Sequence, residues 1–78
     1  MEFSVQLTDK SAGSIADFKQ FCRLFRIDIV QEGKLHYAHE FLVKLTGKSM
    51  FVLSHQSNAL HAYSHLHKVM VQWVEAED

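Results

Sequence analysis

The sequence predicts a single α+β domain over residues 1–78: a four-stranded, mainly antiparallel sheet covered on one face by three helices, which is an open-faced β-sandwich. Two observations lead to this fold class. Segments with the two-residue period of a half-buried strand alternate along the chain with segments of helical period. Hydrophobic residues make up 47% of the sequence and no proline is present, so the chain can bury a continuous core. The expected order of elements is β-α-β-β-α-β-α.

The first strand and the first helix are predicted from a change of period near residue 14. Apolar and polar residues alternate over residues 3–7, as in a strand with one buried face. Over residues 15–25 the apolar residues recur at helical spacing. Ser14 and Asp17 have the spacing of a capping box, so we expect Ser14 to cap this helix.

The middle of the chain predicts a hairpin followed by a second helix. Residues 27–30 and 35–37 are rich in β-prone side chains, and Gly33 between them can supply the positive φ angle of a tight turn. Residues 38–45 have apolar side chains at helical spacing, and Gly47 then suits a left-handed C-terminal cap.

The last third predicts a buried strand and a long final helix. Residues 50–54 form a short apolar run, typical of a strand that is buried on both faces. Ser57 is the expected cap of the final helix, whose apolar stripe includes Met70 and Trp73.

Composition excludes several classes of protein. The single cysteine, Cys22, excludes an internal disulfide and zinc sites built on paired cysteines, and its place among apolar residues predicts a buried thiol rather than a redox sensor. No apolar run approaches the roughly 20 residues of a membrane span, and the first residues lack the pattern of a secretion signal. A net charge of −1 disfavours nucleic-acid binding. We expect a cytoplasmic protein without cofactor, membrane or nucleic-acid partner.

Two short segments carry a resemblance to a known family. Residues 5–11 (VQLTDKS) and residues 32–35 (EGKL), together with the predicted order of elements, resemble the histidine-containing phosphocarrier protein (HPr) family of the bacterial sugar phosphotransferase system. The resemblance implies an HPr-like domain that spans nearly the whole chain. It also implies two functional positions, one at the start of the first helix and one at the start of the second.

The first position departs from the family pattern, in which a Gly-Leu-His-Ala-Arg-Pro run carries the phosphorylated histidine. By counting, Ser14 stands at the place of that histidine, Ala16 at the place of the arginine and Asp17 at the place of the proline. A serine without an adjacent base is a poor nucleophile, and no arginine fork is left to hold a phosphate. We therefore expect no phosphocarrier activity and no enzymatic activity at this position.

The second position is the family's regulatory serine, and Glu40 falls near it here. A carboxylate in the first turn of a helix would partly imitate a phosphoserine, although an ordinary helix-stabilising glutamate is the alternative. The family's docking surface next to it corresponds to Phe41, Leu42 and Leu45, for which core packing is the alternative. These residues predict a partner surface for regulatory proteins. In the resembled family, such partners regulate carbon use.

Six histidines require a separate assessment. His61 and His65 are four residues apart on the last predicted helix and could chelate a metal weakly, but zinc prefers three or four ligands, so we expect solvated side chains and no metal. His36, His39 and His55 are candidates for a phosphate acceptor at a position other than that of the family's histidine.

The sequence thus favours a non-catalytic, HPr-like regulatory or protein-interaction module. Two alternatives stay open. One is a phosphocarrier that uses a non-standard acceptor, either Ser14 or a histidine. The other is an unrelated α+β interaction or dimerisation module.

Overall fold

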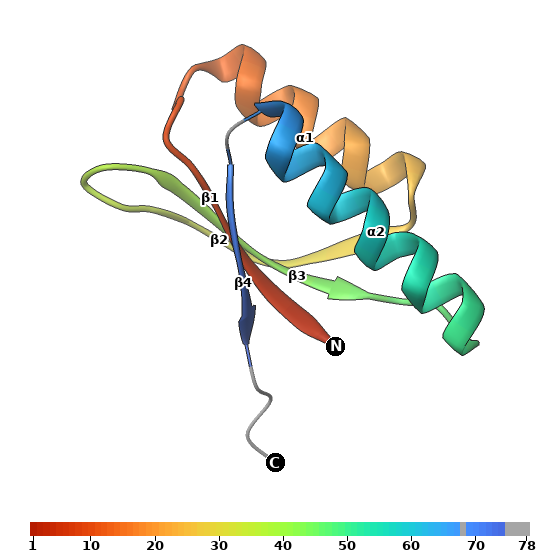
Figure 1. Ribbon diagram of the computed structural model, residues 1–78. Coiled ribbons are helices and arrows are strands. Elements are labelled where there is room, and N and C mark those ends of the chain that lie inside the picture. The colour runs from red at the N-terminus through yellow and green to blue at the C-terminus, as the bar shows by residue number, and fades with distance from the viewer. Residues whose placement is uncertain (68, 75–78) are drawn as a thin grey trace.

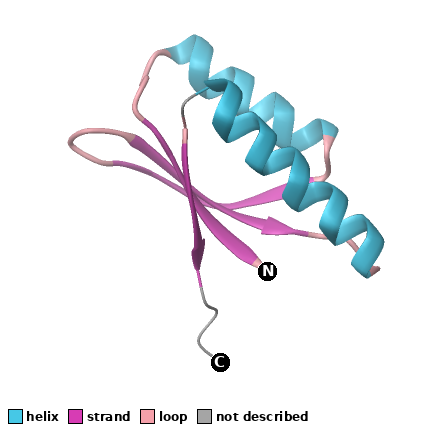
Figure 2. Ribbon diagram, viewed as in Figure 1, coloured by secondary structure: helices cyan, strands magenta, loops and turns pink. Residues whose placement is uncertain are grey.

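A computed structural model describes residues 1–67 and 69–74 and consists of two helices and four strands (Figure 1). In chain order the elements are β1 (Glu2–Leu7), α1 (Ala12–Leu24), β2 (Ile27–Lys34), β3 (His39–Leu45), α2 (Met50–His67) and β4 (Met70–Val74). Both helices lie on the same face of the sheet, which leaves the other face open (Figure 2). The expected α+β class and the open, four-stranded sheet are confirmed.

The sheet has the strand order β2-β3-β1-β4, and each neighbouring pair is antiparallel. The chain thus consists of two β-α-β units, β1-α1-β2 and β3-α2-β4. The two strands of each unit are parallel, and one strand of the other unit lies between them. This β-α-β-β-α-β topology is the split βαβ arrangement, which is also called ferredoxin-like. A consequence for the site is that the start of α1 and the end of α2 meet at the same end of the sheet (Figure 1).

The core lies between the helices and the inner face of the sheet. Strand alternation directs Phe3, Val5 and Leu7 of β1 inward, and β3 contributes every second residue in the same way. On the helix side, the ring of Phe18 lies 4.8 Å from the ring of Phe41 in β3 and 5.5 Å from that of Tyr63 in α2. Phe18 therefore joins α1, α2 and the sheet.

The first half of the chain differs from the prediction in two boundaries. Helix α1 begins at Ala12 and is capped by Ser11, so Ser14 is not the cap. Ser11 is the N-cap because its hydroxyl oxygen accepts a hydrogen bond from the Ser14 backbone N–H. Strand β2 continues through Gly33, which has no positive φ angle. Residues 35–37, expected to be the second strand of the hairpin, form its turn instead, which a bond from the Leu35 N–H to the Ala38 carbonyl closes.

The second half differs more, because a helix and a strand exchange places. Residues 38–45 were expected to be helical, but they contain strand β3, in which Phe41, Val43 and Leu45 alternate into the core. Residues 50–54 were expected to be a buried strand, but they form the start of α2. The expected final helix is confirmed as far as His67, within α2, although Ser57 lies inside that helix and does not cap it. Met70 and Trp73 belong instead to β4, whose valines favour a strand. The described residues therefore hold two helices and not three, because the helix expected over residues 38–45 is a strand.

Gly47 and Gln56 fix the connection between β3 and α2. Gly47 does not cap a helix; a Cβ atom at this residue would lie 2.8 Å from the Val52 side chain, so the close approach requires glycine. The buried Gln56 accepts a bond from the Gly47 N–H and donates to the carbonyls of Phe25 and Arg26. This one amide joins the end of α1 to the start of α2, and it supplies hydrogen-bond partners to three backbone groups of the connecting segments.

Candidate functional site

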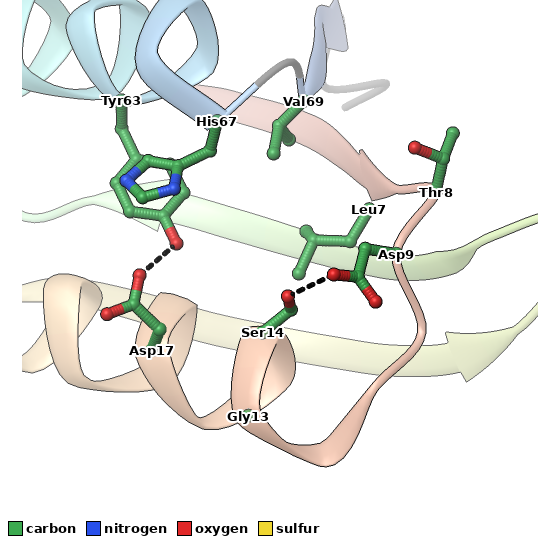
Figure 3. Close-up of a pocket in the computed structure, with 9 residues that line it drawn as sticks. All are labelled: Leu7, Thr8, Asp9, Gly13, Ser14, Asp17, Tyr63, His67 and Val69. Carbon is green, nitrogen blue, oxygen red and sulfur yellow. Dashed lines mark hydrogen bonds between the residues drawn. The ribbon is translucent and has the colours of Figure 1, made fainter.

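The predicted site around Ser14 forms one wall of a hollow of about 320 Å³ between the start of α1 and the end of α2 (Figure 3). We call it the acidic hollow. It is lined by Leu7, Thr8, Asp9, Gly13, Ser14, Asp17, Tyr63, His67 and Val69. Ser14 and Asp17, the two polar residues predicted from the sequence for this site, both line the hollow. Tyr63 and His67 were not predicted to lie here, because they are about fifty residues away in the sequence and no local pattern indicates the contact.

Asp9 governs the electrostatics at the first turn of α1. One carboxylate oxygen accepts the Ser14 hydroxyl at 2.8 Å, and the other accepts the backbone N–H of Ser11 at 3.0 Å. The hydrogen bond from Ser14 and those from Ser11 lower the pKa of Asp9 below its ordinary value. Asp9 is therefore a stable anion at the helix end that would otherwise favour a bound anion.

Asp17 and Tyr63 join the two helices across the hollow. The Tyr63 hydroxyl donates to an Asp17 carboxylate oxygen at 2.7 Å, as the dashed line in Figure 3 shows. Burial, followed by this bond, raises the pKa of Tyr63. The ring of His67 stacks on the ring of Tyr63 at 4.2 Å. Ser14 and Tyr63 thus both donate to carboxylates of the hollow, and the Tyr63–Asp17 bond connects the two helices.

This geometry corrects one step of the sequence analysis. Ser14 does have an adjacent base, Asp9, which the sequence analysis did not recognise. The lowered pKa of Asp9 nevertheless makes it a weak base near neutral pH. Two carboxylates, Asp9 and Asp17, also repel a phosphoryl group from the hollow. Ala16 is exposed in α1 and does not line the hollow, so it adds nothing to such a site.

Glu40 lies in strand β3 and not in the first turn of a helix, so the helix-dipole argument for it does not apply. It is on the open face of the sheet, where one carboxylate oxygen accepts bonds of 3.1 Å from both the Ser4 hydroxyl and the Gln6 amide. These two residues belong to β1, next to β3. Glu40 is thus part of a polar cross-strand network.

The predicted partner surface is divided between the two faces of the sheet. Phe41 and Leu45 are buried in the core, as their core-packing alternative expected, whereas Leu42 is half-buried on the open face. They do not form a helical surface, because alternate strand residues point to opposite faces.

The two candidate metal-binding histidines of α2, His61 and His65, have different surroundings. The His61 Nδ1–H donates to the Ser57 carbonyl at 2.8 Å, and its ring meets that of Phe3 edge to face. His65 is exposed. Among the residues that the structure describes, no group of three or more His, Cys, Asp or Glu side chains is placed to hold a metal ion.

Three consecutive exposed apolar residues lie elsewhere, in the first turn of α2. Met50 is 76% exposed, Phe51 84% and Val52 41%. We call these three residues the apolar start of α2. The sequence analysis missed this surface because it assigned the same run to a buried strand.

Searches of family models, curated proteins and solved structures find no match to this chain. Within residues 1–67 and 69–74, no helix has the length and apolar character needed to cross a bilayer.

Proposed function

We propose that this protein is a non-catalytic protein-interaction module that binds an acidic partner segment at the apolar start of α2. The observation that carries the proposal is the exposure of Met50, Phe51 and Val52, three large apolar residues in a row. Single exposed apolar residues are common on protein surfaces, but contiguous ones are typical of interaction sites. Phe51 is the natural anchor, because aromatic residues contribute much of the binding energy at interfaces.

A hollow beside these residues offers space for an apolar side chain of the partner. Its volume is about 340 Å³, and it lies between α2 and the strands β1 and β4. Its apolar lining consists of Met1, Phe3, Met50, Leu53 and Val71. An apolar side chain that fills such a hollow loses contact with water, which is the usual arrangement at the centre of an interface.

The surrounding charge indicates the chemistry of the partner. Residues 41–74 contain no Asp or Glu, so no carboxylate of this segment adjoins the apolar start of α2. Lys48 is exposed two residues before the helix, and Arg26 is exposed where its backbone meets Thr46 and Gln56. Carboxylates on the partner would complement these cations and steer its approach. Two copies of the chain that met through this same surface would instead bring these cations close to one another.

The proposal keeps the interaction role that the sequence favours but places it on a different surface from Phe41, Leu42 and Leu45. A role with proteins of the phosphotransferase system or of carbon regulation, which the HPr resemblance implies, stays a prediction.

The test is a selection from short random peptides displayed on phage, with the wild-type protein as bait. We expect the selected peptides to combine an apolar anchor with Asp or Glu residues. Their affinity should fall about tenfold or more in the Phe51→Ser variant and should weaken in high salt. The control is Leu66→Ser, which removes a residue that is 80% exposed near the other end of α2 and should leave the affinity unchanged.

Two results would contradict the proposal. One is peptide binding that Phe51→Ser does not change. The other is a wild-type dimer in sedimentation experiments that Phe51→Ser converts to a monomer, because the occupant of the surface would then be a second copy of the chain.

A further inference from the structure

We propose that a third hollow, on the other side of α1 from the acidic hollow, binds the phosphate group of a small organic phosphate. Its volume is about 500 Å³. We call it the basic hollow, and its lining consists of Lys10, Ala12, Ile15, Lys34, Leu35, His36 and His39. Four of these seven side chains are lysine or histidine, and none is Asp or Glu. The inference is independent of the proposed peptide surface.

The basic side chains come from segments that are distant in sequence. Lys10 lies in the connection between β1 and α1, whereas Lys34 ends β2. His36 lies in the turn between β2 and β3, and His39 begins β3. The fold gathers them at one place, next to the first turn of α1. Lysine ammonium groups and imidazoles that converge in this way are suited to a phosphate dianion.

Two hydrogen bonds hold the walls of the basic hollow in place without a ligand. The Lys10 ammonium donates to the His36 carbonyl at 3.0 Å and so ties the hairpin to the loop before α1. An ammonium group has three donors, so two remain for a ligand. The Leu35 N–H donates to the Ala38 carbonyl at 2.8 Å and closes the turn. Walls that are already ordered reduce the entropic cost of binding.

A carboxylate in contact with this group of residues, that of Glu32, is already engaged. Glu32 accepts a hydrogen bond from the His39 Nε2 atom at 2.7 Å and forms an ion pair with Lys19 at 3.1 Å. The bonds from His39 and Lys19 lower the pKa of Glu32, so its charge persists near neutral pH and is balanced by Lys19. The charges of Lys10 and Lys34 are therefore left for a ligand.

The remaining lining indicates an organic ester rather than a free inorganic ion. Ile15 and Leu35 are half-buried and give the hollow an apolar wall. Ala12 brings the first turn of α1 to the same place, and the positive end of the helix dipole adds to the attraction for phosphate. A phosphate on the lysines with a small apolar group on Ile15 and Leu35 uses both parts of the lining.

The experiment is an amide NMR titration of the full chain with phenyl phosphate, with inorganic phosphate and phenol as comparison probes. We expect phenyl phosphate to shift the amides of Ala12, Ile15, Leu35 and His36. It should bind more tightly than inorganic phosphate, and phenol should not bind. The Lys34→Gln variant should weaken binding about tenfold, and Lys10→Gln should act in the same direction.

The matched control is Lys44→Gln, which removes an exposed lysine of β3 that does not line the basic hollow. Its affinity for phenyl phosphate should equal that of the wild type. The proposal fails if no shift appears, if the shifts lie elsewhere, or if Lys44→Gln weakens binding as much as Lys34→Gln does. Equal affinities for inorganic phosphate and phenyl phosphate would overturn the assignment of the apolar wall. Since each spectrum also reports folding, an unfolded Lys10→Gln protein leaves the Lys34→Gln comparison intact.

Discussion

The first turns of α1 border a hollow on each side, and the side chains that line the two hollows have opposite charge. On one side, Gly13 and Ser14 face the acidic hollow, where Asp9 and Asp17 hold the negative charge. On the other side, Ala12 and Ile15 face the basic hollow with its lysines and histidines. The helix dipole contributes about half a positive charge to both sides. The side chains of the neighbouring loops therefore determine which side can accept an anion.

The two hollows also differ in how their polar groups are used. In the acidic hollow, Ser14 and Tyr63 donate to the two carboxylates, so the bonds close within the protein. In the basic hollow, the Lys10 ammonium uses one of its three donors on a carbonyl. The comparison predicts that changes on the acidic side alter stability, whereas changes on the basic side alter binding.

The largest expected effect comes from Phe18→Ala, which should destroy both hollows together. Phe18 is fully buried and packs between the sheet and α2, so it holds α1 in place. Loss of a buried phenyl ring costs about 3–5 kcal/mol, a large part of the stability of a small domain. Urea denaturation followed by circular dichroism measures the change. Phe51→Ala, which removes an exposed ring, is the control and should retain wild-type stability; equal losses would show that the core is not where the structure places it.

A smaller loss is expected from Tyr63→Phe, which removes only the bond to Asp17 across the acidic hollow. The expected cost is about 1–2 kcal/mol in the free energy of unfolding, because the bond is short and its acceptor is a carboxylate. Tyr37→Phe is the matched control, since Tyr37 is 62% exposed in the hairpin turn and should show no loss. Phosphate binding at the basic hollow should survive Tyr63→Phe, and its disappearance would contradict the independence of the two sides.

The same tyrosine gives the acidic side a dependence on alkaline pH. The pKa of Tyr63 is raised in the folded state, so its stabilising contribution is complete below the ordinary tyrosine pKa of about 10 and is lost as the pH rises further. Cys22, whose pKa burial raises to about 12, adds an alkaline loss of the same sign. Since Tyr63→Phe retains Cys22, a less steep loss of stability above pH 10 in this variant isolates the tyrosine. Identical pH profiles for the two proteins would contradict the assignment.

The sequence predicts the strand β1 and the helix α1, because their periods are clear and local. It fails where two periods compete. Leu42 and Leu45 together with Phe41 fit a helical spacing, but Phe41, Val43 and Leu45 also alternate, and pairing with β1 and β2 selects the strand. The run from Met50 to Val52 looked like a buried strand, and nothing local reveals that a helix exposes it. Tyr63 meets Asp17, and His67 lines the same hollow as Ser14, only through the tertiary fold.

The last prediction is that no phosphate will be transferred. After incubation with phosphoenolpyruvate and the general phosphotransferase enzyme of a bacterium, we expect an unchanged intact mass, because Asp9 and Asp17 repel the phosphoryl group and Ser14 has only a weak base. A genuine histidine phosphocarrier in the same reaction is the positive control. An added phosphate that acid removes would contradict the prediction and would identify a histidine as its acceptor.

His67, which lines the acidic hollow, would then be tested by comparing His67→Ala with His65→Ala, since His65 is exposed and does not line the hollow. Loss of the added mass only in His67→Ala would mean that the acidic side accepts the phosphoryl group despite its charge, and the contrast between the two sides of α1 would have to be abandoned.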